Sequence, residues 1–357
     1  MPAIDTFLEF LISSGASDLH LSSGLIPSVR LDGEIRILSG TEAISQEMAQ
    51  KVIEEIMPEH NKVEFRECFD TDFAYELPGV GRFRVNVFMD NHGIGTVIRQ
   101  IPIKILTVDD LNLPPAVRQL CFLNKGLVLV TGPTGSGKST TLAAMIDLIN
   151  EKRTDHIITI EDPIEFVHKN KKCLINHREV HRHTGSFKRA LRAALRQDPD
   201  IVLVGEMRDL ETIEIAIETA ETGHLVFGTL HTNTAPSTVD RIIDQFPADR
   251  QDQIRTMLSS SLRGVISQTL LKKNGGGRVA ALEILVIHSG VSNIIREGKT
   301  HQIFSMMQTG RKYGMVTLNE SLFELVEKEI VSPKEALYRA VDKVSFESML
   351  TTNGYSV

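Results

Sequence analysis

Short runs of alternating hydrophobic and polar residues fill the first part of the chain, to about residue 100. Alternation with a period of two is typical of half-buried β-strands. An Asp-Gly pair, Asp32-Gly33, separates two of the runs and predicts a β-hairpin, and hydrophobic residues recur every fourth position in a predicted helix over 46–56. The predicted strands cover 18–21, 27–31, 34–38, 81–87 and 95–101. Together these elements indicate a small α+β domain with an antiparallel sheet.

The hydrophobic pattern changes after prolines at Pro102, Pro114 and Pro115, which interrupt the regular elements. Beyond them the strand-like segments are continuous apolar runs separated by helical segments, a pattern typical of parallel strands that are buried on both faces. These runs cover 127–130, 157–160, 201–204 and 225–227. A mostly helical region begins near residue 250 and contains a Gly275-Gly276-Gly277 turn and a predicted strand over 279–286.

The length of the chain, 357 residues, is enough for two folded domains, and its hydrophobic content of 41% is close to that of soluble globular proteins. From the change of pattern we predict an N-terminal domain over 1–100 and an interdomain linker over 101–116. An α/β domain that includes a C-terminal helical region is predicted over 117–357.

Charge and cysteine content narrow the classes of function. A formal net charge of −7 argues against the basic field that drives non-specific nucleic-acid binding, so no nucleic-acid partner is expected. The three cysteines lie far apart and form neither a CxxC zinc pattern nor a disulfide framework. The segment Met1–Ser14 lacks the pattern of a secretion signal, and the apolar runs fall far short of the ~20 residues that cross a bilayer. These features favour a cytoplasmic enzyme, with any membrane role peripheral.

A phosphate-binding motif follows the first apolar run of the second domain. Residues 132–139 read GPTGSGKS and match GxxxxGK[ST], with a strand-like run before them and a helix-like run after them. Glycines let backbone N–H groups surround a phosphate, a lysine reaches the β and γ oxygens, and a serine can bind Mg²⁺. The predicted nucleotide-binding residues are Thr134, Gly135, Ser136, Gly137, Lys138, Ser139 and Thr140.

Carboxylates follow two further apolar runs. Glu206 ends the segment 198–206, an apolar strand followed by an acid as in a Walker B motif, where a carboxylate can hold Mg²⁺ partly through water. The alternative is an acid that caps a turn. Glu161 ends the run over 157–160 and is predicted to be a water-activating base. The alternative there is a solvated acidic turn before Pro163.

Two histidines bracket the fourth apolar run, over 225–227. His231 follows the run and is placed to sense the γ-phosphate or relay a signal from it. His224 precedes the run. The alternative to a role in the site is that His224 is a hydrogen-bonded core residue. Spacing alone does not separate these interpretations.

Arginines on predicted strands of the first domain form another candidate group. Alternation puts Arg82 and Arg84 on one face of their strand, and Arg99 lies on a neighbouring strand. The functional hypothesis is that these arginines neutralise the charge of ATP when the two domains close, and the alternative is simple solvation. A predicted helix over 187–196 carries Phe187, Leu191 and Leu195 inward and a basic face outward.

At this point the sequence resembles the secretion ATPase superfamily, the GspE/PulE/PilT-like proteins, and within it the type IV pilus retraction ATPases. The resemblance covers essentially the whole chain. A C-terminal stretch of the retraction proteins, AIRNLIRE, corresponds to GVSNIIRE here. The matching segments are 17–21 near the start, the Walker A segment 132–140, the Asp box 159–166, the Walker B box 198–209 and the His box 222–232.

The resemblance implies a fold, a reaction and partners. The implied fold is a PAS-like N-terminal α+β domain followed by a RecA-like P-loop ATPase domain with C-terminal helices. It implies a homohexamer that binds ATP and Mg²⁺ and powers pilus retraction at the cytoplasmic face of the inner membrane, with a PilC-like platform protein as partner. Implied site residues are Glu161 as base, Glu206 as the Walker B acid, His224 and His231 in the His box, and the arginines Arg82, Arg84 and Arg99 on the nucleotide.

Four alternatives remain open at the level of sequence. One is an accessory paralogue of the retraction motor, because the opening Ala-Ile-Arg of the C-terminal stretch is Gly-Val-Ser here. A second is a pilus-extension or secretion ATPase, although those relatives usually carry a further N-terminal domain and a four-cysteine zinc site. The others are a non-hydrolysing nucleotide-dependent regulator, which intact Lys138 and Glu206 disfavour, and a DNA-translocating hexamer, which the acidic charge disfavours.

Overall fold

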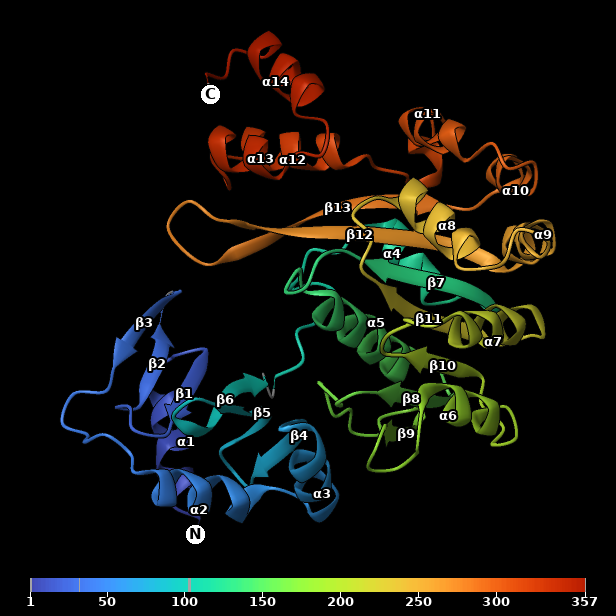
Figure 1. Cartoon of the computed structure of the whole chain (residues 1–357). Helices are drawn as coiled ribbons and strands as arrows, with labels where there is room; N and C mark the ends of the chain where they lie inside the picture. Colours follow the sequence, from blue (N-terminus) through green and yellow to red (C-terminus); the bar gives the residue numbers. More distant parts are fainter. Residues whose placement is uncertain (1, 32, 102–103, 357) are drawn as a thin grey trace. The chain divides into compact units, whose positions relative to one another are not determined.

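The computed structural model describes residues 2–31, 33–101 and 104–356. The chain forms two compact units, coloured along the sequence in Figure 1. The first consists of Met1–Lys104 with Pro163–Val167, and the second of Ile105–Asp162 with His168–Val357. Asp32 and Pro102, which marked a predicted turn and the predicted linker, lie outside the described residues.

The first unit is built on a six-stranded antiparallel sheet with the order β3-β2-β1-β6-β5-β4. Strands β2 and β3 pair directly across the predicted hairpin, with Leu31 opposite Glu34. The strands are β1 (Asp18–Ser22), β2 (Ser28–Leu31), β3 (Glu34–Ile37), β4 (Asp70–Leu77), β5 (Gly81–Asp90) and β6 (Gly93–Ile101), and the helices are α1 (Ile4–Ser13), α2 (Gln46–Ile56) and α3 (Glu59–Cys68). The predicted antiparallel α+β domain is confirmed.

Alternation along these strands separates an apolar face from a polar face. Leu19, Ile98 and Val85 stand opposite one another on β1, β6 and β5, and all three are fully buried against α1 and α2. One position further along, the register joins Asp18, Arg99 and Arg84 in a row on the other face. The apolar face forms the core, and the polar face carries the candidate arginines.

The second unit is built on a seven-stranded sheet with the order β13-β12-β7-β11-β10-β8-β9. The strands from β12 to β9 run parallel, and β13 pairs antiparallel with β12 at one edge. The strands are β7 (Gly126–Thr131), β8 (His156–Glu161), β9 (Leu174–Glu179), β10 (Ile201–Val204), β11 (Leu225–Leu230), β12 (Leu262–Lys272) and β13 (Arg278–Val286).

Helices cover both faces of this sheet, so the central strands are apolar throughout. On one face Leu129, Ile160 and Val204 pack with α6, α7, α8 and α9, and on the other Val130 and Phe227 pack with α4 and α5. The helices are α4 (Pro115–Leu120), α5 (Lys138–Lys152), α6 (Phe187–Ala194), α7 (Leu210–Glu221), α8 (Ala235–Asp244), α9 (Gln251–Ser261), α10 (Ser289–Arg296) and α11 (Ile303–Thr309), with 3-10 turns at η1 (Thr300–Gln302) and η2 (Arg311–Tyr313). The predicted α/β architecture is confirmed.

The C-terminal helices pack on the far end of the β12–β13 hairpin, which runs beyond the other strands (Figure 1). Leu271 of β12 and Ala281 of β13 share a buried cluster with Leu322 and Phe346. Helix α12 begins with a capping box in which Thr317 and Glu320 satisfy each other's backbone N–H groups. The helices are α12 (Leu318–Glu327), α13 (Pro333–Arg339) and α14 (Lys343–Thr352).

Three local predictions differ from the structure. Strand β12 lies in the region predicted to be mostly helical, and β9 was not predicted. Helix α6 ends at Ala194, so Leu195 is the capping residue and is exposed instead of facing inward. Strand β12 pairs with β7, and β9 pairs with β8. Because these strands form through partners elsewhere in the chain, their own residues do not determine them. Among the described residues, no helix has the length and apolar character needed to span a bilayer.

Candidate functional site

The Walker A loop joins β7 to α5 and holds all seven predicted nucleotide-binding residues, from Thr134 to Thr140, in the loop or the first turn of the helix. Gly132, Gly135 and Gly137 have φ angles of 141°, 76° and 91°, which favour glycine. The ammonium group of Lys138 donates to the carbonyl oxygens of Gly132 at 2.8 Å and Pro133 at 3.1 Å. The loop therefore curls round this lysine at a helix N-terminus, an arrangement that favours an anion.

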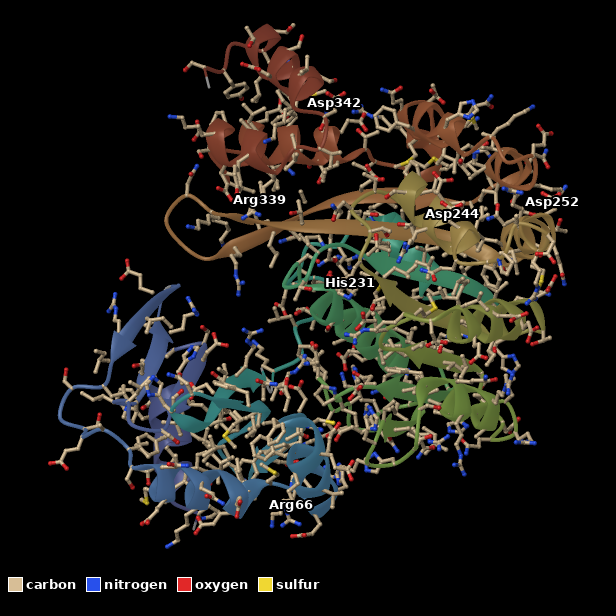
Figure 2. All side chains as sticks on the ribbon, in the orientation of Figure 1. Arg66, His231, Asp244, Asp252, Arg339 and Asp342 are labelled. Atoms are coloured by element: carbon tan, nitrogen blue, oxygen red, sulfur yellow. The ribbon has the colours of Figure 1, made fainter. Side chains whose placement is uncertain are left out.

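Three more predicted residues lie at the same edge of the sheet as this loop. Glu161 ends β8, Glu206 follows β10 and His231 follows β11, and these strands are parallel neighbours. The Gly205 N–H donates to the Ile160 carbonyl at 2.7 Å, so the ends of β8 and β10 meet just before the two acids. Figure 2 labels His231 in this region. The structure thus brings together the loop, both carboxylates and one histidine, because carboxyl ends of parallel strands share an edge.

Glu206 is held by an arginine and a histidine. Its Oε1 lies 2.7 Å from His231 Nε2 and 2.6 Å from Arg208 Nε. Burial raises the pKa of Glu206, but the hydrogen bonds and charges of Arg208 and His231 outweigh burial and hold the pKa below its ordinary value. Glu206 is therefore ionised at neutral pH. Sequence reasoning missed Arg208, although its place two residues after the Walker B acid is a usable signal.

Glu161 has a histidine neighbour that sequence reasoning also missed. His177 Nδ1 lies 3.9 Å from Glu161 Oε1 and 2.8 Å from the Thr159 hydroxyl. His177 Nε2 lies 3.1 Å from the His168 backbone nitrogen, and because that N–H donates, the lone pair of Nε2 accepts it. His177 Nε2 also lies 3.4 Å from the His168 carbonyl, so the ring is held between His168 on one side and Thr159 and Glu161 on the other. No sequence signal identified His177, because β9 was not predicted to lie beside β8.

Among the predicted residues of the second unit, His224 is the one that the structure does not bring to this edge. It precedes β11, and its carbonyl accepts from the N–H of Gly126, the first residue of β7. The Walker A loop follows the other end of β7. Nδ1 of His224 lies 3.1 Å from the Thr219 carbonyl, at the end of α7. This geometry matches the alternative of a hydrogen-bonded structural residue.

The three candidate arginines belong to the first unit. Arg99 Nε donates to Asp18 Oδ1 at 2.7 Å, and Arg84 Nε lies 3.4 Å from Asp72 Oδ1. Burial raises the pKa of Asp18, and hydrogen bonds from Ser17 and Arg99 lower it more, so that the net shift is downward. Arg82 lies opposite Ile101 on the same face as Arg84, as alternation predicted. On this face Asp18 fixes Arg99, Arg84 lies near Asp72, and Glu76 stands opposite Arg82.

A glutamine on β12 contacts the Walker A loop and was also missed. Gln268 is buried, with 3% of its surface exposed, and its amide lies between the loop and α5. The Thr131 and Ser267 hydroxyls, 2.7 Å apart, join β7 and β12 at the preceding position. No sequence signal pointed to Gln268, because its strand was not predicted.

The oxygen donors at this edge suit Mg²⁺. Ser139 offers a hydroxyl in the first turn of α5, and Glu206 offers an ionised carboxylate. Over the described residues, no three His, Cys, Asp or Glu side chains are arranged to enclose a metal ion. Ser139 and Glu206 would supply the one or two protein oxygens that Mg²⁺ takes besides waters and those of a phosphate substrate.

Comparison with known proteins places this site in a family. The model of the family described as type II/IV secretion system protein matches residues 1–338. The chain is 53% identical over 337 residues to the type IV pilus retraction ATPase PilT of Pseudomonas aeruginosa, covering 94% of this chain and 98% of that protein. It is 37% identical over 337 residues to the type IV pilus ATPase PilU of the same organism, covering 94% and 88% of the two chains.

A solved structure matches the fold over nearly its full length. The crystal structure of the pilus retraction motor PilT with bound ADP has a TM-score of 0.89 and 46% sequence identity, and the match covers 98% of this chain and 100% of that chain. The expected PAS-like domain followed by a RecA-like ATPase domain with C-terminal helices is therefore confirmed. The chain belongs to the type II/IV secretion system protein family, and within that family it is an ATPase of the pilus retraction type.

Proposed function

We propose that this ATPase works as a homohexameric motor whose ATP hydrolysis powers retraction of a type IV pilus. The observation that carries the proposal is the meeting of the Walker A loop, Glu161 and Glu206 at one edge of the sheet. The identity of 53% to a pilus retraction ATPase, over 98% of that protein, supports retraction as the use of the energy.

In the proposed reaction, water attacks the γ-phosphorus of ATP and the bond to the β-phosphate oxygen breaks. Glu161 orients the water and accepts its proton. Lys138 exchanges the Gly132 and Pro133 carbonyls for phosphate oxygens and stabilises the charge that spreads over them. His231, hydrogen-bonded to Glu206, responds to the state of the phosphate site. His224 is left out of this set because of its place at the other end of the strands.

Mg²⁺ would be held by Ser139 and, partly through water, by Glu206. When bound it would neutralise charge on the β- and γ-phosphate oxygens. In the same proposal, Arg82, Arg84 and Arg99 complete this neutralisation when nucleotide binds. Arg99 Nε lies 2.7 Å from Asp18 Oδ1. The proposal is that Arg99 exchanges this carboxylate for a phosphate oxygen.

Nucleotide binding would favour a closed form of each subunit, and hydrolysis would allow that subunit to open again. The subunits of the hexamer would then move in turn. We propose that this motion acts on an inner-membrane platform protein of the PilC kind, from the cytoplasmic face of the inner membrane. The proposed partner is a protein and not a nucleic acid, in line with the net charge of −7.

The comparisons favour the principal retraction motor over the accessory paralogue. Identity to PilT of P. aeruginosa is 53%, and identity to PilU of the same organism is 37% over the same length of 337 residues. The stretch that departs from the retraction motif in its first three residues forms α10, where Val291 and Ile295 are buried. The apolar residues of this stretch therefore pack α10 against the rest of the second unit.

Cells that lack this protein are expected to carry excess pili that do not shorten. Wild-type protein should restore shortening, whereas Lys138→Ala should not, because the loop loses the charge that holds the phosphates. The measurement is pilus number per cell and the length of single labelled pili over time. Cells without pili would make the protein an extension ATPase, and unchanged pili would contradict any role as the principal motor.

The pH dependence of hydrolysis gives a separate test of Glu206. Because its pKa is held below the ordinary value, Glu206 stays ionised as the pH falls into the acidic range. Arg208→Met removes a hydrogen bond and a charge that lower this pKa, so the carboxylate should become protonated at a higher pH. We expect the acid limb of the kcat profile to move to higher pH in Arg208→Met.

Arg196→Met, at an exposed site beyond α6, is the control and should keep the acid limb of the wild type. Acid limbs that superimpose for Arg208→Met and the wild type would contradict this role of Arg208.

A further inference from the structure

The Walker A loop is fastened to the sheet by one side chain that no motif includes. Gln268 Nε2 donates to the Ser136 carbonyl at 2.6 Å. Gln268 Oε1 accepts from the Thr141 hydroxyl at 2.9 Å. With only 3% of its surface exposed, Gln268 makes both bonds out of contact with bulk water. One amide therefore ties the tip of the loop to the first turn of α5.

The chemistry of the partners determines which way the amide points. A carbonyl oxygen only accepts, so the nitrogen of Gln268 must face Ser136, and the amide oxygen is left for the Thr141 hydroxyl. Glutamate has the same shape but would place a carboxylate oxygen against the Ser136 carbonyl. The two bonds therefore require glutamine specifically, because only the amide supplies a donor and an acceptor at these two places.

The bond to Ser136 also determines where the next N–H points. The peptide between Ser136 and Gly137 is planar, and in a trans peptide the C=O and N–H groups point in opposite directions. With the Ser136 carbonyl held toward Gln268, the Gly137 N–H is turned to the opposite side. In a phosphate-binding loop, N–H groups of this kind surround the phosphate.

The backbone of the loop approaches β12 closely at two of its glycines. A Cβ on Gly137 would lie 3.0 Å from Gln268 Nε2, and a Cβ on Gly132 would lie 2.3 Å from the Gln268 carbonyl oxygen. Both glycines have positive φ angles. Gln268 is thus in contact with the loop at its beginning and at its end. The backbone contact at Gly132 excludes a larger side chain, and a side chain at Gly137 would require the Gln268 amide to move.

We propose that Gln268 is a positioning residue for nucleotide binding, which holds the Ser136–Gly137 peptide in the orientation that receives phosphate. The inference rests on the proposed ATP site in this loop. A loop held in its binding conformation loses less entropy when the ligand arrives, so removing the amide should weaken binding of ATP and ADP alike. Turnover at saturating ATP should change little, because Gln268 contacts the loop and not the attacking water.

The test compares the full-length wild-type protein with Gln268→Met and Gln268→Glu. The measurements are the Kd for ADP by calorimetry, KM and kcat for ATP, and the rise in Tm that ADP produces. We expect the Kd and KM to rise about tenfold in Gln268→Met, as for the loss of one to two hydrogen bonds, and further in Gln268→Glu. The ADP-induced rise in Tm should shrink in both, and kcat should stay within about twofold.

Gln253→Glu, an exposed change on α9, controls for the added charge and should leave nucleotide binding as in the wild type. If Gln268→Met does not fold, Thr141→Val removes one of the two bonds and should raise the Kd by a few-fold. Variants with lower Tm but the full ADP-induced rise would show a structural role only and overturn the inference. Lys138→Ala separates the two proposals: if wild type binds ADP no better than Lys138→Ala, the proposed site itself fails.

Discussion

Replacing Glu206 with glutamine is expected to lower ATP turnover by about 10²–10³-fold, a loss of the size seen when one preorganised electrostatic group is removed from an active site. The amide keeps the shape of the carboxylate but loses the charge that His231 and Arg208 now bind at 2.7 and 2.6 Å. It also loses the ligand proposed for Mg²⁺. ATP binding should persist, because the Walker A loop is unchanged. Single-turnover hydrolysis and nucleotide binding, measured on the same preparation, check both halves of this expectation.

Glu327→Gln provides a matched control for that variant, because Glu327 is an exposed residue of α12. It makes the same chemical change away from the sheet edge and should turn over ATP as the wild type does. Normal turnover in Glu206→Gln would remove Glu206 from the mechanism. Loss of both binding and turnover would show instead that Glu206 supports the loop and is not specific to the chemical step.

Replacing Gly132 with alanine is expected to lower nucleotide affinity by about a hundredfold or more. The added Cβ would lie 2.3 Å from the Gln268 carbonyl and 2.7 Å from the Ser136 hydroxyl, so β12 and the loop must separate. In addition, Gly132 has a φ of 141°, and a side chain there costs about 1–3 kcal/mol in backbone strain. Calorimetric titration with ADP measures the affinity, and denaturant unfolding measures the loss of stability.

Gly185→Ala is the matched control for the glycine change. A Cβ on Gly185 would meet no atom within 4 Å, and its φ is not positive. This variant should bind ADP and unfold as the wild type does. Equal ADP affinity in Gly132→Ala and the wild type would mean that the loop tolerates displacement from β12, and that the contact seen here is not needed for binding.

Local patterns were enough to predict the elements that carry the site. The continuous apolar runs over 127–130 and 201–204 correspond to β7 and β10, because strands buried on both faces need apolar residues at every position. The glycine spacing and the lysine of the Walker A motif predicted a loop between strand and helix. Placing Glu161, Glu206 and His231 at carboxyl ends of strands then followed from chain order alone.

Other residues near the site depend on contacts between distant segments. His177 faces Glu161 only because β9 pairs with β8. Arg208 differs, because it follows Glu206 by two residues and is a local neighbour of that acid. His224 and His231 bracket β11, so the strand itself puts them at its opposite ends. Alternation and spacing do not contain the pairing of β9 with β8, and for that reason they could not identify His177 as a neighbour of Glu161.

The sequence by itself determined the two kinds of sheet, the phosphate loop and the acids at its edge, since periodicity, glycine positions and strand ends are local properties of the chain. Only the tertiary structure decided which strand lies beside that loop. Strand β12 pairs with β7 after a shift in register between Leu262 and Gly264, and this places Gln268 next to Gly132. A shift of one residue would turn that amide to the opposite face of the sheet, so its contact with the loop depends on long-range pairing.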